Sequence, residues 1–290
     1  MEFPPRTGPP TREAPLSDIT DGTPEKDPNE AAQTVTVWPQ FLLRRMRSSC
    51  ASERIYKWTL PAYKGELPDG RSYNACPTAS VCADLCYARV GHFRHRGVLA
   101  AHQRNLRYVL DDLPGWEARM TRELQHRRYR PADGTAVHVR VHDAGDYLSL
   151  PYLQAWMRIC RSAPHVTFYS YTKQVALLEK WVRPDPPANF HWRYSYGGTQ
   201  DRLIDPQLHP HADVFPDEDS LEEAGYTSQT PSDLRAVYGP TTLGVAANNI
   251  PHLKRRQGRQ TFRQLQQAAD ADNPHRRPRD STAPHRPQAD

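Results

Sequence analysis

Short runs in which apolar and polar residues alternate recur through the middle of the chain, and each ends in a polar turn. Four of them are clear, at 54–64 (RIYKWTLPAYK), 136–146 (AVHVRVHDAGD), 165–173 (HVTFYSYTK) and 190–198 (FHWRYSYGG), and the first is expected to be a strand that ends at its proline. Weaker runs lie at 211–216 and 241–248. A period of two residues is typical of β-strands, so the pattern predicts five or six strands.

Between these runs, apolar residues recur every three or four positions, as they do on one face of an α-helix. Such stretches lie at 97–113, 116–127, 149–160, 174–182 and 217–226. In the third stretch Ser149 suits an N-cap, and Pro151 suits the first helical turn. The pattern therefore predicts helices between most of the strands.

Strands that alternate with helices favour an α/β fold with a mainly parallel sheet and helices packed outside it. We expect a partial (β/α) barrel, in which right-handed crossovers bring every strand-to-helix loop to one edge. The loops after the first four strands carry a cysteine cluster, HDAGD, SYTK and SYGG. Their convergence predicts one polar pocket at the C-terminal ends of the strands.

Proline-rich segments with few apolar residues flank this region. The chain holds 28 prolines and only 37% hydrophobic residues, and the excess of proline lies at the two ends. Such segments bury too little apolar surface to offset the entropy of ordering them. We expect a single α/β domain at 34–267 between a disordered N-terminal segment (1–33) and a disordered tail (268–290).

The sequence contains no sign of a membrane or secretory protein. No stretch approaches the ~20 apolar residues of a membrane span, and the first residues lack the apolar core of a signal peptide. Five cysteines, three of them bunched together, do not resemble a secreted disulfide framework. We expect a cytoplasmic protein with reduced thiols and no membrane contact.

Positive charge is concentrated toward the end of the chain. Residues 251–290 hold nine Lys and Arg against four Asp, a surplus of five that equals the formal net charge of the whole chain, +5. A basic segment suits weak contact with nucleic acid or another polyanion. It equally suits a solvated tail that aids solubility.

Three cysteines with C-x5-C-x3-C spacing form the most specific chemical signal. Cys76, Cys82 and Cys86 lie within eleven residues, and thiolates select zinc, copper(I) or iron–sulfur clusters. His92 or His95 would complete a four-ligand zinc site. A [4Fe–4S] cluster held by three cysteines would instead leave one iron open to a substrate or cofactor.

The other two cysteines are weaker candidates for a fourth ligand. Cys160 ends a predicted helix, away from the strand ends, so we expect it to take no part. Cys50 lies just upstream of the first strand and stays open as a ligand.

The three later loops supply candidate catalytic and binding groups. His142, Asp143 and Asp146 bracket the Ala-Gly of HDAGD, where carboxylates can bind a ligand's ammonium or hydroxyl groups or act as acid and base. Lys173 can pair with a ligand's carboxylate or phosphate. The candidate catalytic residues are therefore Asp143, Asp146 and Lys173.

The fourth loop adds candidate binding residues. Ser195 and Tyr196 precede Gly197 and Gly198, and the two glycines permit close backbone approach to a ligand.

The stretches CPTASVCADLCYAR, RVHDAGDY, FYSYTK and GPTTLGVAAN resemble the "gene product eighty-eight" domain family of actinobacteria and their phages, over roughly residues 50–250. The layout is in turn similar to the core of radical S-adenosylmethionine (SAM) enzymes. That similarity implies that Cys76, Cys82 and Cys86 bind a [4Fe–4S] cluster whose open iron is chelated by SAM.

The same similarity assigns SAM contacts. It implies that His142 to Asp146, with Gly145 in the place of a Gly-Gly-Glu segment, face SAM and that Tyr87 lies near the adenine. Two features depart from the radical SAM pattern: the usual spacing is C-x3-C-x2-C, and Gly-Gly-Glu is absent.

Two functions follow as hypotheses. The first is an iron–sulfur protein that cleaves SAM, with a reductant, to start radical chemistry on an unidentified substrate. The alternative is a zinc-stabilised nucleic-acid-binding protein of a mobile element, with Cys76, Cys82, Cys86 and His92 as ligands and the basic tail on phosphates. Measuring which metal the purified protein contains distinguishes the iron–sulfur hypothesis from the zinc hypothesis.

Overall fold

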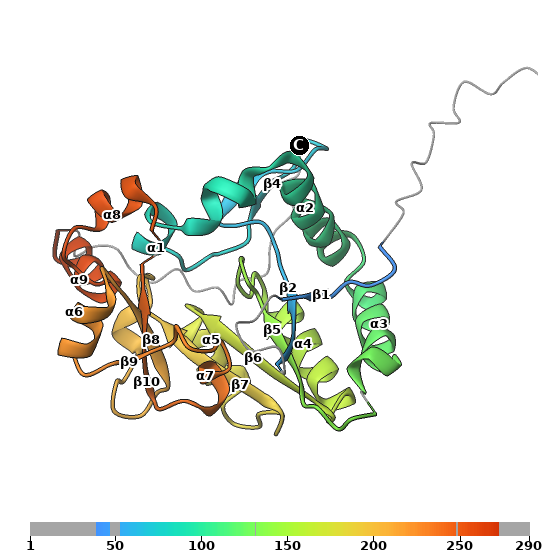
Figure 1. Ribbon diagram of the computed structural model, residues 1–290. Helices are drawn as coiled ribbons and strands as arrows, with labels where there is room; N and C mark the ends of the chain where they lie inside the picture. The colour runs from blue at the N-terminus through green and yellow to red at the C-terminus, as the bar shows by residue number, and fades with distance from the viewer. Residues whose placement is uncertain (1–38, 47–52, 131, 248, 273–290) are drawn as a thin grey trace, which may run out of the picture. The chain divides into compact units, whose positions relative to one another are not determined.

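The computed structural model describes residues 39–46, 53–130, 132–247 and 249–272 (Figure 1). Its centre is a sheet in which six parallel strands lie side by side in the order in which they occur along the chain. These strands are β2 (Arg54–Trp58), β5 (Val137–Val141), β6 (Val166–Thr172), β7 (Phe190–Ser195), β8 (His211–Phe215) and β10 (Thr242–Ala246).

Two short strands complete the edges of the sheet. The first, β1 (Arg44–Arg45), pairs antiparallel with β2, and β9 (Thr227–Ser228) pairs parallel with β10. The two edge strands do not pair with each other in the described part of the chain, so the sheet is open. A mainly parallel α/β sheet with sequential strand order confirms the predicted fold class, and the barrel is not closed.

Four helices pack on the outer face of the sheet: α3 (Leu113–Leu124), α4 (Leu150–Ser162), α5 (Val175–Trp181) and α6 (Glu218–Glu223). The Trp116 ring lies 5.2 Å from the rings of both Tyr152 and Trp156, and all three side chains are fully buried. Ser149 caps α4, since its hydroxyl accepts a hydrogen bond from the Tyr152 N–H at 3.4 Å. The predicted outer helices and this N-cap are confirmed.

The opposite face of the sheet carries α7 (Arg235–Tyr238). Arg193 on β7 is buried and donates hydrogen bonds to four backbone carbonyls, those of Arg235, Ala236, Gly239 and Thr241, at 2.9–3.1 Å. A guanidinium suits this place because its planar donors can satisfy several free carbonyls at a helix end. These bonds fix α7 against the inner face.

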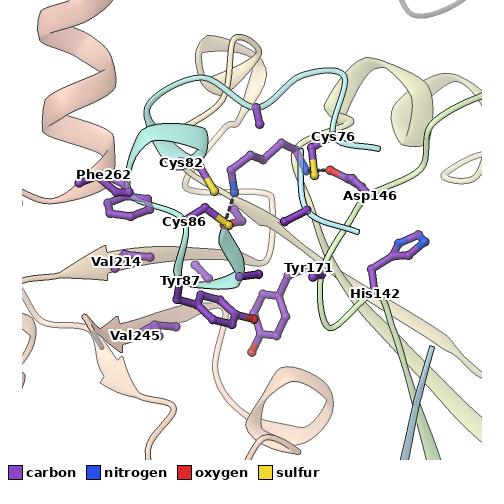
Figure 2. Close-up of a pocket in the computed structure, with 18 of the residues that line it drawn as sticks. Cys76, Cys82, Cys86, Tyr87, His142, Asp146, Tyr171, Val214, Val245 and Phe262 are labelled. Carbon is purple, nitrogen blue, oxygen red and sulfur yellow. Dashed lines mark hydrogen bonds between the residues drawn. The ribbon is translucent and has the colours of Figure 1, made fainter. Parts of the chain in front are cut away.

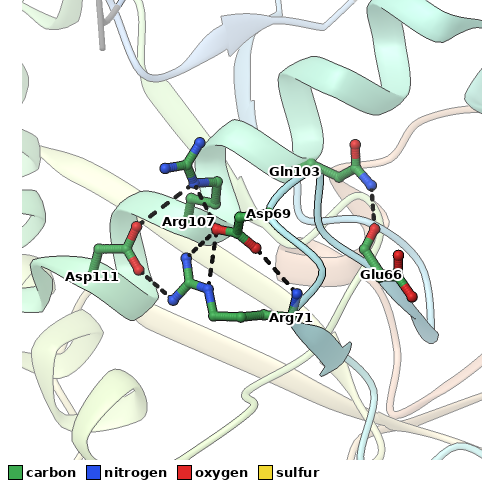
Figure 3. A network of polar contacts seen from close by, with 6 residues as sticks. All are labelled: Glu66, Asp69, Arg71, Gln103, Arg107 and Asp111. Carbon is green, nitrogen blue, oxygen red and sulfur yellow. Dashed lines mark hydrogen bonds and ion pairs between the residues drawn. The ribbon is translucent and has the colours of Figure 1, made fainter. Parts of the chain in front are cut away.

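The run at 54–64, expected to be a strand that ends at its proline, forms β2, which ends at Trp58, three residues before Pro61. The last residue of the run, Lys64, begins a second strand, β3 (Lys64–Glu66), which forms a hairpin with β4 (Ser72–Asn74). An exposed polar network ties this hairpin to α2 (Arg96–Asp111), with Arg71 between Asp69 and Asp111 at 2.8 and 2.7 Å (Figure 3). Exposed ion pairs contribute little free energy each, so the network orients the hairpin more than it stabilises it.

The remaining elements are short helices and the C-terminal pair. They are α1 (Val81–Asp84), η1 (Tyr87–Arg89), η2 (Gly91–Arg94), η3 (Arg127–Tyr129), η4 (Asp201–Leu203), α8 (Pro251–Gln257) and α9 (Phe262–Asp272). The last helix runs five residues beyond the expected domain end at 267. The expected boundary at 33/34 and most of the expected tail lie outside the described residues. No described helix is long and apolar enough to cross a membrane.

Candidate functional site

The loops at the C-terminal ends of the strands enclose a cavity of about 210 Å³. Three of its walls come from the cysteine loop, the HDAGD loop and the ends of β6 and β7. Figure 2 shows Cys82 and Cys86 near Phe262 at one end, and Cys76 beside Asp146 farther along. The structure thus brings together the four clusters that the sequence placed after successive strands.

All three clustered cysteines line this cavity. Their loop is held by the turn after β7, because the Ser80 and Cys82 N–H groups both donate to the Gly197 carbonyl, at 3.1 and 3.0 Å. The Cys76 sulfur also accepts a hydrogen bond from the Tyr63 N–H at 3.4 Å. Backbone donors to sulfur are one of the protein's means of tuning a thiolate-bound metal.

The remaining cysteines differ in position. Cys160 is fully buried on α4 and does not line the cavity, in agreement with its predicted exclusion. Cys50 lies outside the described residues.

Burial controls the protonation of two thiols. It raises the pKa of the Cys76 thiol well above its usual range and that of Cys86 to about 12. Both are therefore neutral thiols in the metal-free protein, and a metal must displace their protons when it binds.

Lys173 supplies a positive charge that can compensate the negative charge of thiolates in the cavity. Burial lowers its pKa, but the neighbouring Cys82, Asp201 and Asp146 outweigh that effect and hold the pKa above its ordinary value. Its Nζ donates to the Ser195 hydroxyl at 2.8 Å, and both residues line the cavity. A permanent positive charge beside the sulfurs favours thiolates and an anionic metal centre.

Asp143 lies in a network of opposite charges. Its carboxylate is 2.5 Å from the Lys57 ammonium and 3.8 Å from the Arg140 guanidinium. Burial favours the neutral acid, but Arg140 and Lys57 outweigh it and lower the pKa. Tyr87 donates its hydroxyl to the Asp143 carbonyl at 2.7 Å, so two predicted site residues are held together in one wall of the cavity.

Asp146 is positioned by three hydrogen bonds. Its carboxylate accepts from the Thr172 hydroxyl at 2.6 Å, the Lys173 N–H at 2.9 Å and the Tyr147 N–H at 2.8 Å. Its own N–H donates to the Ala75 carbonyl at 2.7 Å, next to Cys76. Burial raises the pKa of Asp146 despite these bonds. Asp146 therefore joins β6 to the cysteine loop.

His142 and Gly145 shape the same wall. His142 has φ 69° and is buried, and its Nε2 lies 2.9 Å from the Tyr152 hydroxyl. Burial lowers its pKa to about 3, so the ring is neutral. At Gly145, φ is 86° and an added Cβ would lie 2.7 Å from the Leu60 Cβ. Only glycine fits this turn without displacing Leu60, which lies two residues after β2.

The SYGG loop differs from expectation in two ways. Tyr196 does not line the cavity; its ring packs 5.5 Å from that of His211. Gly197 and Gly198 approach the cysteine loop rather than a ligand, since Cβ atoms there would lie 3.3 Å from the Cys82 Cβ and 2.9 Å from the Thr78 carbonyl oxygen. The glycines are required for docking two loops together.

Several residues of the cavity were missed by the sequence reasoning. Arg140 lines it from the inner face of the sheet, and Phe262 lines it from α9. The sequence pattern could have indicated Arg140, because it is a polar residue between two valines of β5. No sequence pattern indicates Phe262, because it lies far along the chain from the other lining residues that the loops supply.

A site for a single metal ion is not formed. Among residues 39–46, 53–130, 132–247 and 249–272, no three His, Cys, Asp or Glu side chains gather closely enough to hold one ion. His92 and His95, the expected fourth zinc ligands, are exposed and do not line the cavity.

Comparison with known proteins places the chain in a family. Residues 39–273 match the family described as gene product 88. The chain belongs to the gene product 88 family. A member, the gene 88 protein of Mycobacterium phage L5, is 30% identical over 120 residues, which cover 37% of this chain and 46% of that protein. No solved structure matches the chain.

Proposed function

We propose that this gene product 88 protein is an iron–sulfur protein that binds a [4Fe–4S] cluster through Cys76, Cys82 and Cys86. The observation that carries the proposal is the common cavity of these three thiols at the C-terminal ends of parallel strands. Cys160, the other cysteine among residues 39–46, 53–130, 132–247 and 249–272, is buried elsewhere, so the described residues leave one iron without a thiolate ligand. Such an open iron suits a second ligand such as SAM.

The arrangement favours a cluster over a single zinc ion. Four zinc ligands converge on one centre, with Zn–S distances of about 2.3 Å. In a [4Fe–4S] cluster each thiolate binds its own iron, so the sulfurs stand apart around a larger body. All three cysteines line one cavity, whereas His92 and His95, the expected fourth zinc ligands, do not line it.

When bound, a reduced cluster with an open iron supplies the electron that cleaves SAM. The chain's own residues hold and orient the reactants. The Asp143 carboxylate, kept ionised by Lys57 and Arg140, offers a negative charge to an ammonium group. Tyr87 supplies an aromatic wall beside it.

The opposite wall of the cavity is apolar and excludes water from the reaction. Val214, Val245 and Phe262 line it (Figure 2). We place the substrate on this side and SAM on the polar side. Asp146 is fully engaged in hydrogen bonds, so we assign it a positioning role in place of proton transfer.

The first test is anaerobic reconstitution with iron and sulfide. The full chain should develop broad absorbance near ~400 nm, as thiolate-bound clusters do. A variant with Cys76→Ser, Cys82→Ser and Cys86→Ser should remain colourless, and Cys160→Ala should behave as the full chain. Stoichiometric zinc without iron in protein purified anaerobically would refute the cluster and favour the zinc alternative.

The second test addresses SAM. The reconstituted protein is reduced with dithionite, in place of its unidentified reductant, and mixed with SAM. We expect 5′-deoxyadenosine, and we expect Asp143→Asn to lower its yield about tenfold or more, a loss of about 1.4 kcal/mol in binding or barrier. A cluster that forms but yields no 5′-deoxyadenosine would contradict the radical reaction alone.

A further inference from the structure

Two segments that border the cavity carry a dense group of cationic side chains. One runs through η1, η2 and the start of α2, and the other is α8 with the turn after it. We call these residues the cationic rim; all are exposed, and they are Arg89, Arg94, Arg96, Lys254, Arg255, Arg256 and Arg259.

The rim lies near the cavity because two of its elements, η1 and α8, line it, and η2 with the start of α2 directly follows η1 in the chain. Tyr87 and Ala88 of η1 line the cavity next to Arg89, and Leu253 and Gln257 line it from α8. The α8 side is linked to the cysteine loop by Arg256, whose Nη2 is 3.6 Å from the Asp84 carboxylate.

Few carboxylates offset this charge. Asp84 is paired with Arg256. Asp217 lies near Lys254 and Arg259, although hydrogen bonds from Ser220 lower its pKa more than these cations do. In the described part of the chain, Arg94, Arg96 and Arg255 form no ion pair. Their charge is available to an anionic partner.

The chemistry of the rim favours phosphodiesters. Six of its seven cations are arginines, whose planar donors bind phosphate oxygens in pairs. The rim contains none of the exposed large apolar side chains, which are Leu110, Trp181, Leu203, Leu208 and Tyr238. The charge of the rim would attract an anionic lipid surface, but the rim has no large apolar side chain to insert into the lipid.

The cavity below the rim suits a base. Its apolar wall of Val214, Val245 and Phe262 can cover the flat face of a nucleobase, and Gln229 and Gln257 bring amide groups to the same cavity. An acidic peptide would use the rim and leave this wall unfilled. A base stacked in a duplex cannot reach an enclosed site without leaving the stack.

We propose that the cationic rim binds a single-stranded nucleic acid and that an unpaired base enters the apolar side of the cavity beside the cysteines. This inference rests on the proposed function only in taking the cavity as the place of reaction. Binding itself needs no cluster, so it can be measured on the metal-free chain, and its failure is distinct from a failure of reconstitution.

The experiment compares two variants that each lose three positive charges. The rim variant is Arg94→Gln, Arg255→Gln and Arg259→Gln. The control is Arg44→Gln, Arg122→Gln and Arg127→Gln, on β1, α3 and η3, elements away from α8 (Figure 1). Both keep residues 273–290, so the basic end of the chain contributes equally.

Affinity is measured by fluorescence anisotropy with labelled RNA and DNA strands of about 12 nucleotides. We expect the rim variant to bind about tenfold or more weakly than the unmodified chain, and its salt slope to fall by about 2, because three arginines no longer neutralise phosphates. The control should bind within about twofold of the unmodified chain. A duplex of the same sequence should bind about tenfold more weakly than the single strand.

Three results would overturn the proposal. Equal losses of affinity in the rim and control variants would show that binding depends on the net charge of the protein and not on the rim. Equal affinity for duplex and single strand would exclude entry of a base. Competition by polyglutamate as strong as that by the unlabelled strand would assign the rim to an acidic protein instead.

Discussion

Asp143 and Asp146 lie in one short loop, yet their surroundings drive the pKa values of the two carboxyls in opposite directions. Lys57 and Arg140 lower that of Asp143 against the effect of burial, whereas burial raises that of Asp146. The difference separates their roles: Asp143 keeps a charge toward the cavity, and Asp146 joins β6 to the cysteine loop. The residue type alone does not distinguish them.

Asp201 is a residue whose protonation affects stability near neutral pH. Its carboxyl accepts the N–H groups of Gly197 and Gly198 at 2.7 and 2.8 Å, and burial raises its pKa to about 7. Because the folded protein holds this proton more tightly than the unfolded chain, the stabilisation is complete below the unfolded pKa and is lost as pH rises through 7.

We therefore expect the free energy of unfolding to fall with pH through this group, by about 1.4 kcal/mol per unit between about pH 5 and 6. Asp201→Asn removes the titration, so urea unfolding of both proteins across this range isolates the effect as a difference in slope. Parallel profiles for the two proteins would contradict it.

At the scale of elements, the loop between β5 and α4 depends on its contact with the end of β2. Gly145 and Gly70 have nearly equal φ angles, 86° and 85°. An added Cβ would overlap with Leu60 at Gly145, whereas at Gly70 it would point into open space. The two sites form a matched pair in which backbone strain is constant and steric overlap differs.

Gly145→Ala should lower the free energy of unfolding by about 3 kcal/mol, because overlap with Leu60 adds to the strain of a left-handed residue. Gly70→Ala should cost about 1 kcal/mol from strain alone. Chemical denaturation of the two variants measures both values. Equal losses of unfolding free energy in the two variants would show that the loop can move away from Leu60 without an energetic penalty.

The elements themselves could be predicted where their patterns are local. The alternation at 165–173 became β6 at 166–172, and Ser149 and Pro151 fixed the start of α4. The run 54–64 was expected to be a strand that ends at its proline, and β2 ends at Trp58, three residues before Pro61, which has no N–H to donate. Periodicity does not reveal the second strand, β3, that begins at Lys64.

The convergence of Cys76, Asp143 and Lys173 could also be predicted, because loops after parallel strands share an edge. The contacts of Tyr196 and Phe262 could not, since they depend on packing between segments that are distant in sequence.

At the scale of the whole molecule, α9 closes the cavity next to the cysteine loop. The Phe262 ring lies 3.0 Å from where a Cβ on Gly197 would be, and the Gln266 side chain, which is fully buried, accepts a hydrogen bond from the Val81 N–H at 3.3 Å. Figure 1 shows α8, α9 and α1 together at one end of the sheet.

A chain that ends at Gln260, which keeps α8, should therefore melt about 10 °C lower than one that ends at Asp272, since it loses the buried face of α9. Alkylation followed by mass spectrometry should find Cys82 modified about tenfold faster in the shorter chain, because opening of the cavity becomes more frequent. Cys160, buried on α4, is the internal control. Equal Cys82 rates in the two chains would refute closure by α9.

The order of the strands has a consequence for biosynthesis. Each parallel strand pairs with the one made just before it, so the sheet can grow in step with the ribosome. The cysteine loop is complete by residue 86, while the helix that covers it is made only after β10. Under the proposed function, the three thiols would be open to a donor of iron and sulfide throughout that interval. Cofactor loading would then precede the last step of folding, and α9 would cover the bound cluster.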